Sequence, residues 1–413
     1  MQNQTFIREI VEMQKAYDVV VVGGGPSGAT AASELARAGY SVALLDKPGR
    51  IKPCGGAVPP RLIRDFDIPD ELIEARAHCA RMIAPSGAQV DMPIDGGYVG
   101  MVDRARFDEW LRQRAVQHGA ERFDGTFLDI DCDVDSNNSD GHCELRFRSH
   151  SEPVKEQSLR ARYVIGADGA NSAVGRHTVK GADRVPFVAA YHEIVKSDGS
   201  NAIDFDPARC DVYYQGQVSP DFYGWVFPHG DVTSVGVGSA KKGFKLRQAT
   251  KRLRQSAGMT DADTVRCEGA PIPLKVMKRW DNGRNVILSG DAAGVVAPAS
   301  GEGIYYAMRC GQLVAGAVEQ SLVTNNPRAL ATARKAFMKE SGKVFFILGI
   351  MQRFWYRSDK LREKFVHICK DKDVQRLTWE AYMNKELVRK KPLAHVRIFF
   401  KDLAHLCGVA HIR

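Results

Sequence analysis

A cysteine next to two glycines is the first feature of this chain that could take part in chemistry. In the segment Lys52-Pro53-Cys54-Gly55-Gly56-Ala57, the two glycines allow the backbone to approach a planar ring. The thiol of Cys54 is small enough not to block that approach. It could donate a proton there, or it could pack as a small apolar side chain, and the residues leave both interpretations open.

A run of alternating aromatic residues is the second such feature. The segment reads Tyr223-Gly224-Trp225-Val226-Phe227-Pro228. Because side chains along a strand alternate between two faces, we expect Tyr223, Trp225 and Phe227 to form one flat wall. Such a wall suits a long apolar ligand, and its ring faces would tolerate a developing positive charge. An ordinary core strand is the alternative.

The elements that would position a ligand begin with a βα turn near the N-terminus. An apolar strand runs into the pattern G-x-G-x-x-G, formed by Gly23, Gly25 and Gly28, and good helix formers follow. Such a turn directs the N–H groups of a helix N-terminus at a pyrophosphate. The next strand ends at Asp46, which is placed to bond an adenosine ribose hydroxyl. The pattern therefore predicts a dinucleotide site.

Two later segments indicate which dinucleotide is bound. A short apolar strand leads into Ser289-Gly290-Asp291-Ala292-Ala293-Gly294, and a helix opens near Gly303. This resembles the second FAD fingerprint of the flavoprotein hydroxylases and reductases, in which Asp291 would bond a ribityl hydroxyl. The helix would direct its N-terminus at the pyrimidine edge of the flavin and stabilise negative charge on the reduced ring. Between the two fingerprints, Ala167-Asp168-Gly169 resembles the middle motif of the same superfamily.

Four segments together make the chain similar to the geranylgeranyl reductases. Residues 53–56, 103–108, 223–228 and 290–303 carry this resemblance, which covers about residues 17–325. Within that family, the segments around Cys54 and Glu302 resemble the reductases of the bacteriochlorophyll branch.

The resemblance implies an FAD-dependent enzyme that reduces three of the four double bonds of a geranylgeranyl group, with NADPH as the electron source. The substrate would be geranylgeranyl-bacteriochlorophyll or geranylgeranyl diphosphate, and the sequence does not choose between them. The resemblance also implies that Arg104 contacts the flavin, that Cys54 lies beside its ring, and that the aromatic wall lines the prenyl cavity. With one dinucleotide fingerprint in the chain, the nicotinamide donor would dock transiently.

Isolated alkenes are not electrophiles, so hydride can be added only if a proton arrives at the other carbon. The reaction needs a dry pocket, aromatic faces that tolerate positive charge, and a proton source. Cys54, Tyr305, Tyr306 or an ordered water could supply the proton. We take Cys54, Tyr223 and Trp225 as the catalytic candidates, with Phe227 joining Tyr223 and Trp225 in binding the substrate.

The predicted cofactor site collects residues from all of these motifs. Its members are Gly23, Gly25, Pro26, Ser27, Gly28, Asp46, Lys47, Cys54, Gly55, Gly56, Ala57, Arg104, Asp168, Gly290, Asp291, Pro298, Gly301, Gly303 and Ile304.

The order of the motifs predicts an α/β fold (α+β overall) built from three parts. The first is a discontinuous, Rossmann-like FAD-binding domain, the second a β-rich substrate domain and the third a basic helical C-terminal region. Their expected boundaries are 17–50, 98–180 and 281–325 for the first, 51–97 and 181–280 for the second, and 326–413 for the third. Nine scattered cysteines without C-x-x-C spacing argue against a zinc site and against a disulfide framework.

The net charge of +9 is concentrated near the C-terminus. Residues 340–413 contain sixteen Lys or Arg and eight Asp or Glu, interleaved with aromatic residues such as Phe345, Phe346, Trp355 and Tyr356. This pattern favours an anionic membrane surface over nucleic acid, and a merely solvated basic region is the alternative. No apolar run approaches the roughly 20 residues of a membrane span. The sequence therefore predicts a cytoplasmic protein that associates peripherally with the photosynthetic membrane, and it leaves the oligomeric state open.

Two other functions fit parts of the pattern. A flavin-dependent aromatic monooxygenase shares all three FAD motifs, but the Cys54-Gly55-Gly56 segment and the aromatic wall favour the reductase. A non-catalytic pigment or lipid carrier with a structural flavin is the second alternative.

Overall fold

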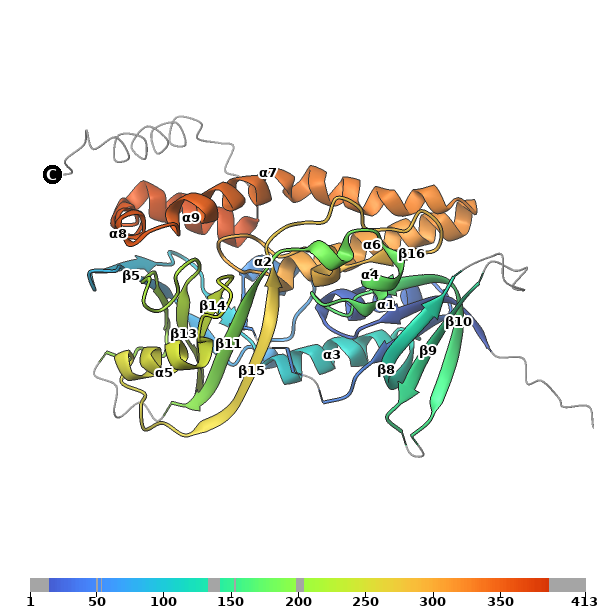
Figure 1. The fold of residues 1–413 in the computed structure, drawn as a ribbon, viewed down its shortest axis with the longest axis horizontal. Helices are drawn as coiled ribbons and strands as arrows, with labels where there is room; N and C mark the ends of the chain where they lie inside the picture. The colour runs from blue at the N-terminus through green and yellow to red at the C-terminus, as the bar shows by residue number, and fades with distance from the viewer. Residues whose placement is uncertain are drawn as a thin grey trace, which may run out of the picture.

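The computed structural model describes residues 15–49, 51–52, 54–132, 142–151, 154–197 and 204–385, drawn in colour in Figure 1. Two large sheets lie side by side, and a layer of long C-terminal helices runs across both of them.

The first sheet is mostly parallel and contains the predicted nucleotide-binding strand. Its strands follow the order β1-β2-β8-β9-β10-β16, with β1 also paired to β10. β1 carries four consecutive valines, as expected for a strand covered on both faces. Helix α1 (Pro26–Arg37) packs between α3 (Arg104–Gln117) and α6 (Ile304–Thr324). The strands are β1 (Ala16–Val22), β2 (Val42–Asp46), β8 (Glu121–Asp131), β9 (Cys143–Ser149), β10 (Glu156–Gly166) and β16 (Val286–Leu288).

The second sheet has seven strands in the order β15-β11-β14-β13-β12-β5-β6. Every neighbouring pair is antiparallel except β12 with β5. Helix α5 (Leu246–Ser256) packs against β11 and β14. The strands are β5 (Cys79–Ile83), β6 (Gln89–Pro93), β11 (Phe187–Lys196), β12 (Arg209–Tyr213), β13 (Gly224–His229), β14 (Val232–Ser239) and β15 (Thr264–Pro273).

Short elements connect the two large sheets. A three-stranded sheet has the order β3-β7-β4, and α2 and α4 are helices of six residues each. These elements are β3 (Ala57–Val58), β4 (Ala75–Ala77), β7 (Val99–Met101), α2 (Pro60–Asp65) and α4 (Ala173–Thr178). Both large sheets draw strands from separate stretches of the chain, and the exact division into domains stays a prediction.

The C-terminal region is helical as far as it is described, with α7 (Ala331–Trp355), α8 (Asp359–Ile368) and α9 (Lys372–Asn384). Three of the aromatic residues that stand among its basic ones, Phe345, Trp355 and Tyr356, are buried. Phe345 belongs to the core cluster of the first sheet, and Trp355 and Tyr356 belong to a cluster beside the second sheet. Residues 386–413, which hold part of the predicted basic tail, lie outside the described residues.

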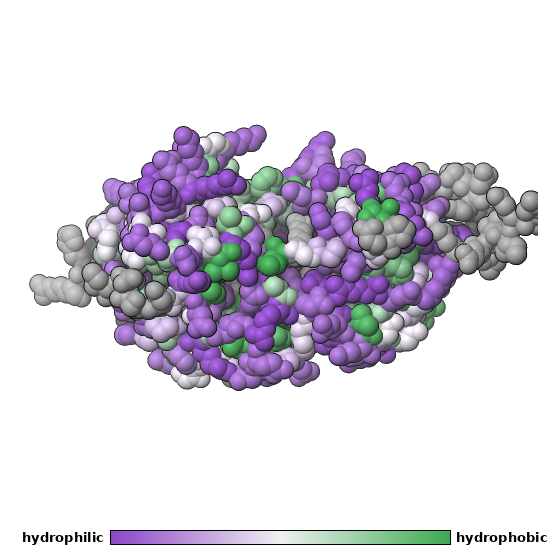
Figure 2. All heavy atoms as spheres, turned by 90° about the horizontal axis from the view of Figure 1, so that it is seen from below, coloured by the Kyte–Doolittle hydropathy of each residue, from purple (hydrophilic) through white to green (hydrophobic). Residues whose placement is uncertain are grey.

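Figure 2 shows the molecule from below, and α7 runs along the top of Figure 1. The face seen from below is mostly hydrophilic, with apolar residues only in small separate patches. Among the described residues, no helix has both the length and the apolarity needed to cross a bilayer.

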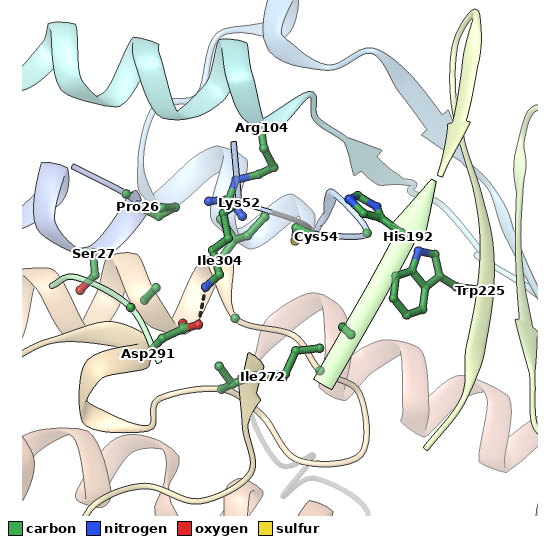
Figure 3. A pocket seen from close by; sticks show the side chains of 18 of the residues that line it. Pro26, Ser27, Lys52, Cys54, Arg104, His192, Trp225, Ile272, Asp291 and Ile304 are labelled. Carbon is green, nitrogen blue, oxygen red and sulfur yellow. Dashed lines mark hydrogen bonds and ion pairs between the residues drawn. The ribbon is translucent and has the colours of Figure 1, made fainter. Parts of the chain in front are cut away.

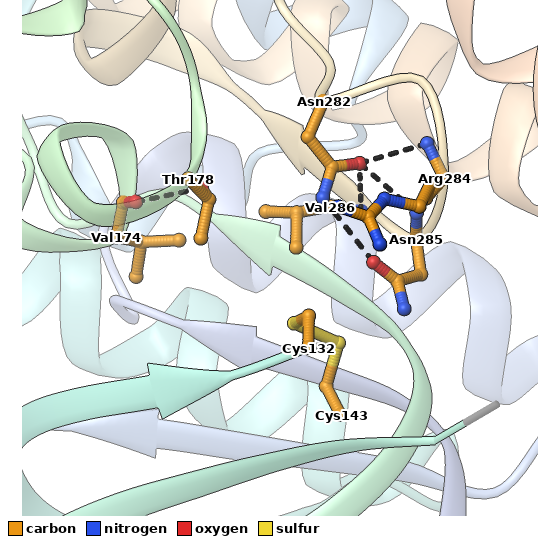
Figure 4. Close-up of a disulfide and its surroundings, with 8 residues drawn as sticks. All are labelled: Cys132, Cys143, Val174, Thr178, Asn282, Arg284, Asn285 and Val286. Carbon is orange, nitrogen blue, oxygen red and sulfur yellow. Dashed lines mark hydrogen bonds between the residues drawn. A yellow bond between two sulfur atoms is a disulfide. The ribbon is translucent and has the colours of Figure 1, made fainter. Parts of the chain in front are cut away.

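One disulfide differs from the expectation drawn from the cysteine spacing. Cys132 follows β8 and Cys143 opens β9, and their sulfur atoms are bonded (Figure 4). These strands are antiparallel neighbours, so the two Cα atoms lie 4.3 Å apart. The predicted hairpin tip at 133–141 between them lies outside the described residues. The spacing of the cysteines along the chain does not show that Cys132 and Cys143 lie on adjacent strands.

Candidate active site

A cavity lies where the N-termini of α1 and α6 approach the second sheet, as Figure 3 shows. It brings together the two FAD fingerprints, the cysteine-glycine segment and the aromatic wall. The predicted residues that line it are Gly25, Pro26, Ser27, Cys54, Gly55, Arg104, Tyr223, Trp225, Phe227, Asp291, Gly301, Gly303 and Ile304.

The first glycine turn has the geometry that a bound pyrophosphate requires. Gly23 has a φ of +105°, and a Cβ on Gly28 would collide with the carbonyl oxygen of Gly23. A Cβ on Gly25 would meet no atom within 4 Å, so open space lies in front of this glycine. Gly25 also caps α1 without any side-chain hydrogen bond, so the first turn keeps its N–H groups for a ligand.

The carboxyl group of Asp46 lies at the end of β2, outside the cavity lining. Its Oδ2 accepts a hydrogen bond of 3.1 Å from Arg112 of α3, a partner that the sequence did not reveal. Burial raises the pKa of Asp46, although the Gly24 N–H and the Arg112 guanidinium act in the opposite direction. Like Asp46, the predicted cofactor residues Gly23, Gly28, Lys47, Gly56, Ala57, Gly290 and Pro298 do not line the cavity.

Asp291 is buried at the cavity wall and forms an ion pair with Lys52 (Figure 3). Lys52 therefore belongs to the site, although only its neighbours Cys54, Gly55 and Gly56 were predicted for it. Beside this pair, Gly303 caps α6 with no side-chain hydrogen bond. The N-terminus of this long helix thus contributes positive potential to the cavity next to the Lys52 ammonium.

Arg104 is buried at the start of α3 and forms a bidentate ion pair with Asp108, at 2.8 and 2.7 Å. Burial opposes the charge of Arg104, but the Asp108 carboxylate and the Cys54 thiol outweigh burial and raise the pKa of the guanidinium. Arg104 therefore stays charged beside Cys54.

Asp168, like Asp46, does not line the cavity, and its assignment to the cofactor site stays a prediction. Its carboxylate accepts hydrogen bonds from the Ser172 hydroxyl at 2.5 Å and from the Ala173 N–H at 2.6 Å. The Asp168 carboxylate is therefore hydrogen-bonded to the residues that begin α4, while the neighbouring Gly169 lines the cavity. An aspartate in a turn before a short helix can hydrogen-bond to the first residues of that helix. The sequence motif does not distinguish this role from binding of the cofactor.

The aromatic wall forms as predicted from the alternation. Tyr223, Trp225 and Phe227 all line the cavity, and the rings of Tyr223 and Trp225 meet edge to face with centroids 6.1 Å apart. The hydroxyl of Tyr223 donates to the Ser300 carbonyl at 2.5 Å. Gly55 packs under Phe227, since a Cβ there would lie 2.9 Å from the ring. The cysteine-glycine segment and the wall therefore face each other across the cavity.

The two tyrosines considered as proton donors lie elsewhere. Tyr305 and Tyr306 are buried in the first turn of α6, and neither lines the cavity. Burial raises the pKa of both hydroxyls above its ordinary value. Of the proton donors named from the sequence, Cys54 is the side chain that the fold brings to the cavity.

Several lining residues carry no motif and could not be found from the sequence. Most come from β11 and β15, strands whose side chains reach the cavity only after the second sheet has formed. They are Ala190, Tyr191, His192, Ile272, Val296 and Ala307.

The donor set fits an adenine dinucleotide that carries a flavin. The open face at Gly25 and the uncapped N-terminus of α1 suit the pyrophosphate, and Asp46 suits a ribose hydroxyl. Asp291, Lys52 and the N-terminus of α6 surround the place where the ribityl chain and the pyrimidine edge are expected. When bound, such a group supplies the hydride chemistry that no side chain can provide.

Comparisons with known proteins agree with this donor set. A family model described as an FAD binding domain matches residues 16–316. The geranylgeranyl diphosphate reductase of Rhodobacter capsulatus is 54% identical over 393 residues, which cover 95% of this chain and 98% of the relative. The geranylgeranyl diphosphate reductase of Synechocystis sp. is 35% identical and covers 94% of this chain and 97% of the relative.

Among solved structures, a geranylgeranyl bacteriochlorophyll reductase-like protein from Thermoplasma acidophilum matches with a TM-score of 0.78. The match covers 92% of this chain and 100% of the other, at 23% sequence identity. At this identity the likeness shows a shared fold.

Proposed function

Since this chain belongs to the geranylgeranyl reductase family of FAD-binding flavoproteins, we propose that it reduces isolated double bonds of a geranylgeranyl group in bacteriochlorophyll synthesis. The observation that carries this proposal is the cavity in which the aromatic wall faces Cys54, Arg104 and the predicted flavin site. The substrate is the pigment ester or the free diphosphate.

Each reduction adds one hydride and one proton across a C=C bond. The π electron pair of the alkene takes the proton at the less substituted carbon, and the hydride completes the more substituted one. Bound FAD, once reduced, is the source of the hydride. Tyr223 and Trp225 hold the chain and offer ring faces to the developing positive charge, and Cys54 supplies the proton. Arg104 lines the cavity beside Cys54.

NADPH is the electron source in this proposal, and a second cavity supports it. This cavity shares Lys52, Cys54 and Arg104 with the first, and Arg106 and Arg266 also line it. Glu74 and Asp103 also line this cavity and pair with Arg106 and Arg266, so what supports the docking of a nicotinamide dinucleotide is the place of the cavity beside Cys54.

Replacing Trp225 by alanine tests the assignment of the wall. We expect prenyl reduction to slow more than flavin reduction by NADPH, because the indole lines the substrate cavity. Stopped-flow absorbance resolves the two half-reactions. Trp225→Phe keeps an aromatic face and serves as the conservative control. Equal losses in both half-reactions would make Trp225 a core support. Oxygen consumption coupled to product formation would instead indicate a monooxygenase. An enzyme that neither reduces the prenyl substrate nor consumes oxygen would indicate a carrier.

Replacing Asp291 by alanine tests the flavin site. The variant loses a charge-assisted hydrogen bond worth about 1.5–3 kcal/mol, and Lys52 loses its counter-charge. We therefore expect a strong drop in FAD occupancy, measured as flavin absorbance per protein. Asp211→Ala is the matched control, since that carboxylate pairs with Arg209 away from the cavity lining and its loss should leave occupancy nearly unchanged. Full occupancy in Asp291→Ala would show that the ribityl site lies elsewhere.

The membrane surface is the proposed source of the apolar substrate. On α7, Phe346, Ile347 and Ile350 are 69%, 41% and 53% exposed, with Lys343 and Arg353 exposed on either side. Apolar side chains flanked by basic ones supply both contributions to binding at an anionic interface.

We expect the enzyme to sediment with anionic liposomes at low salt and less at high salt. Each basic residue at the surface contributes up to about 1 kcal/mol, so neutralising Lys343 and Arg353 should weaken binding. Phe346→Ser should also release the protein. Phe187→Ser changes an exposed apolar residue of β11 and is the control. Liposome binding that does not change with salt or with these substitutions on α7 would assign substrate delivery to another element.

A further inference from the structure

A row of opposed residues crosses the second sheet on the same face as Trp225 of the aromatic wall. The strand registers place Glu268 of β15 opposite His192 of β11, His192 opposite Gly236 of β14, and Gly236 opposite Trp225 of β13. Directly opposed residues of antiparallel strands share one face. Four neighbouring strands therefore align a carboxylate, an imidazole, a gap and an indole, and both His192 and Trp225 line the cavity.

The gap at Gly236 is what lets the indole reach its partners. A Cβ at this position would collide with the six-membered ring of Trp225 and would lie 2.7 Å from the Cβ of His192. Without it, the Trp225 ring lies over β14 and its Nε1 donates to the Ser234 hydroxyl at 3.0 Å. Trp225 is therefore fixed in one orientation by packing and by one hydrogen bond.

Ser234 connects the indole to His192. Its Oγ lies 2.9 Å from His192 Nδ1, and His192 Nε2 lies 2.7 Å from Glu268 Oε2 in a close but poorly aligned contact. The carboxylate favours the imidazole proton on Nε2, so Nδ1 accepts from the Ser234 hydroxyl. The hydrogen bonds then run in one direction, from Trp225 through Ser234 to His192, and the His192 ring faces the Glu268 carboxylate without an aligned hydrogen bond.

The far end of the row is anchored to the helix that carries Arg104. Arg266 Nε lies 2.9 Å from Glu268 Oε1 as an ion pair without an aligned hydrogen bond, and Arg266 Nη2 donates to Asp103 Oδ2 at 2.7 Å. Asp103 is the N-cap of α3, directly before Arg104. The network thus joins the substrate wall to the helix start on the opposite side of the cavity.

We propose that His192 and Ser234 are positioning residues that act through Trp225, holding and polarising its indole for the cationic stage of prenyl reduction. This inference rests on the proposed function. An N–H that donates into a chain whose last ring faces a carboxylate leaves the indole ring richer in electrons. A richer ring face attracts a developing carbocation more strongly.

A double-mutant cycle tests this coupling in the FAD-loaded enzyme. One hydrogen bond corresponds to about a three- to tenfold change, so Ser234→Ala should lower kcat for prenyl reduction by that factor with KM nearly unchanged. In the Trp225→Phe background, which lacks the indole N–H, the same substitution should cost less than twofold. Ser239→Ala removes another β14 hydroxyl, bonded to Asp221, and should show no coupling. An equal loss in both backgrounds would overturn the proposal.

A spectroscopic measurement decides the same question without turnover. With 5-fluorotryptophan, the five tryptophans give separate ¹⁹F signals, and Trp225→Phe identifies one of them. We expect that signal to move in Ser234→Ala, in His192→Asn and in Glu268→Gln, and to stay in Ser239→Ala. A signal that ignores all three changes would overturn the inference. If the wild-type enzyme reduced no prenyl substrate, only the proposed function would be overturned. The ¹⁹F shifts would still test the coupling between Trp225 and its neighbours, because they do not depend on turnover.

Discussion

Replacing Cys54 by alanine is expected to lower the rate of prenyl reduction by about 10²–10⁴-fold, the usual contribution of a general acid. The thiol lines the cavity and contributes to the raised pKa of the charged Arg104 beside it. Tyr305 and Tyr306 do not line the cavity. In the proposed mechanism, loss of the thiol removes the proton donor, which lines the same cavity as the aromatic wall.

Two further variants separate acid catalysis from packing. Cys54→Ser keeps a donor of similar size and should retain part of the activity, and FAD binding should stay nearly intact in both Cys54 variants. Cys79→Ala changes a half-buried cysteine that does not line the cavity, and it should behave like the wild type. Single-turnover rates with reduced enzyme measure the effect. A loss of only a few-fold in Cys54→Ala would assign the thiol to packing.

The sequence predicted those parts of the site whose geometry is local. Gly23, Gly25 and Gly28 lie within six residues; Gly23 and Gly28 have no room for a side chain, and Gly25 leaves open space where a ligand could lie. The wall follows from the alternation of one strand, so Tyr223 and Trp225 could be placed on one face before the sheet was known. Family membership, which these motifs indicated, is confirmed by the comparisons.

Partnerships between distant segments could not be predicted in this way. Lys52 and Asp291 are 239 residues apart in the sequence, and Arg112 and Asp46 are 66 apart. His192 carries no motif and reaches the cavity only because β11 lies between β14 and β15. A side chain whose role depends on sheet order gives no signal in a local pattern.

A local pattern also cannot tell which aromatic residues of a helix are buried and which are exposed. Phe345 and Trp355 alternate with basic residues, but a long helix buries one face and exposes the other. The exposed face of α7 instead carries Phe346 and Ile350. The basic and aromatic composition indicated a surface function, and helix packing selects which residues are available for it.

A buried ion pair joins the C-terminal helices to the loop that opens α6. Lys385, which follows α9, pairs with Glu302, and their side chains are 3% and 8% exposed. The Lys385 ammonium also lies 3.9 Å from the ring centroid of Tyr382. Burial raises the pKa of Glu302 and lowers the pKa of Lys385, while each charge partly restores that of the other. Each charge is therefore tolerated only because its partner is present.

Lys385→Ala should destabilise the folded enzyme at neutral pH by about 3–5 kcal/mol, because it leaves the buried carboxylate of Glu302 without its cation. The pKa of Glu302 is already raised in the folded state, so the folded protein binds this proton more tightly than the unfolded chain does. The loss should therefore shrink as the pH falls toward the range in which Glu302 is protonated. Denaturant unfolding at several pH values measures both effects.

The double variant Glu302→Gln with Lys385→Met removes both charges at similar volume. Because it buries no unpaired charge, its stability should return close to that of the wild type. Arg309→Ala is the matched control, since its pair with Glu340 is about one third exposed on each side and should contribute at most about 1 kcal/mol. If Lys385→Ala were as mild as this control, water would reach Glu302. Other contacts would then hold the C-terminal helices on the loop that opens α6. One of them is the hydrogen bond of 2.9 Å that the Tyr356 hydroxyl donates to the Ala299 carbonyl.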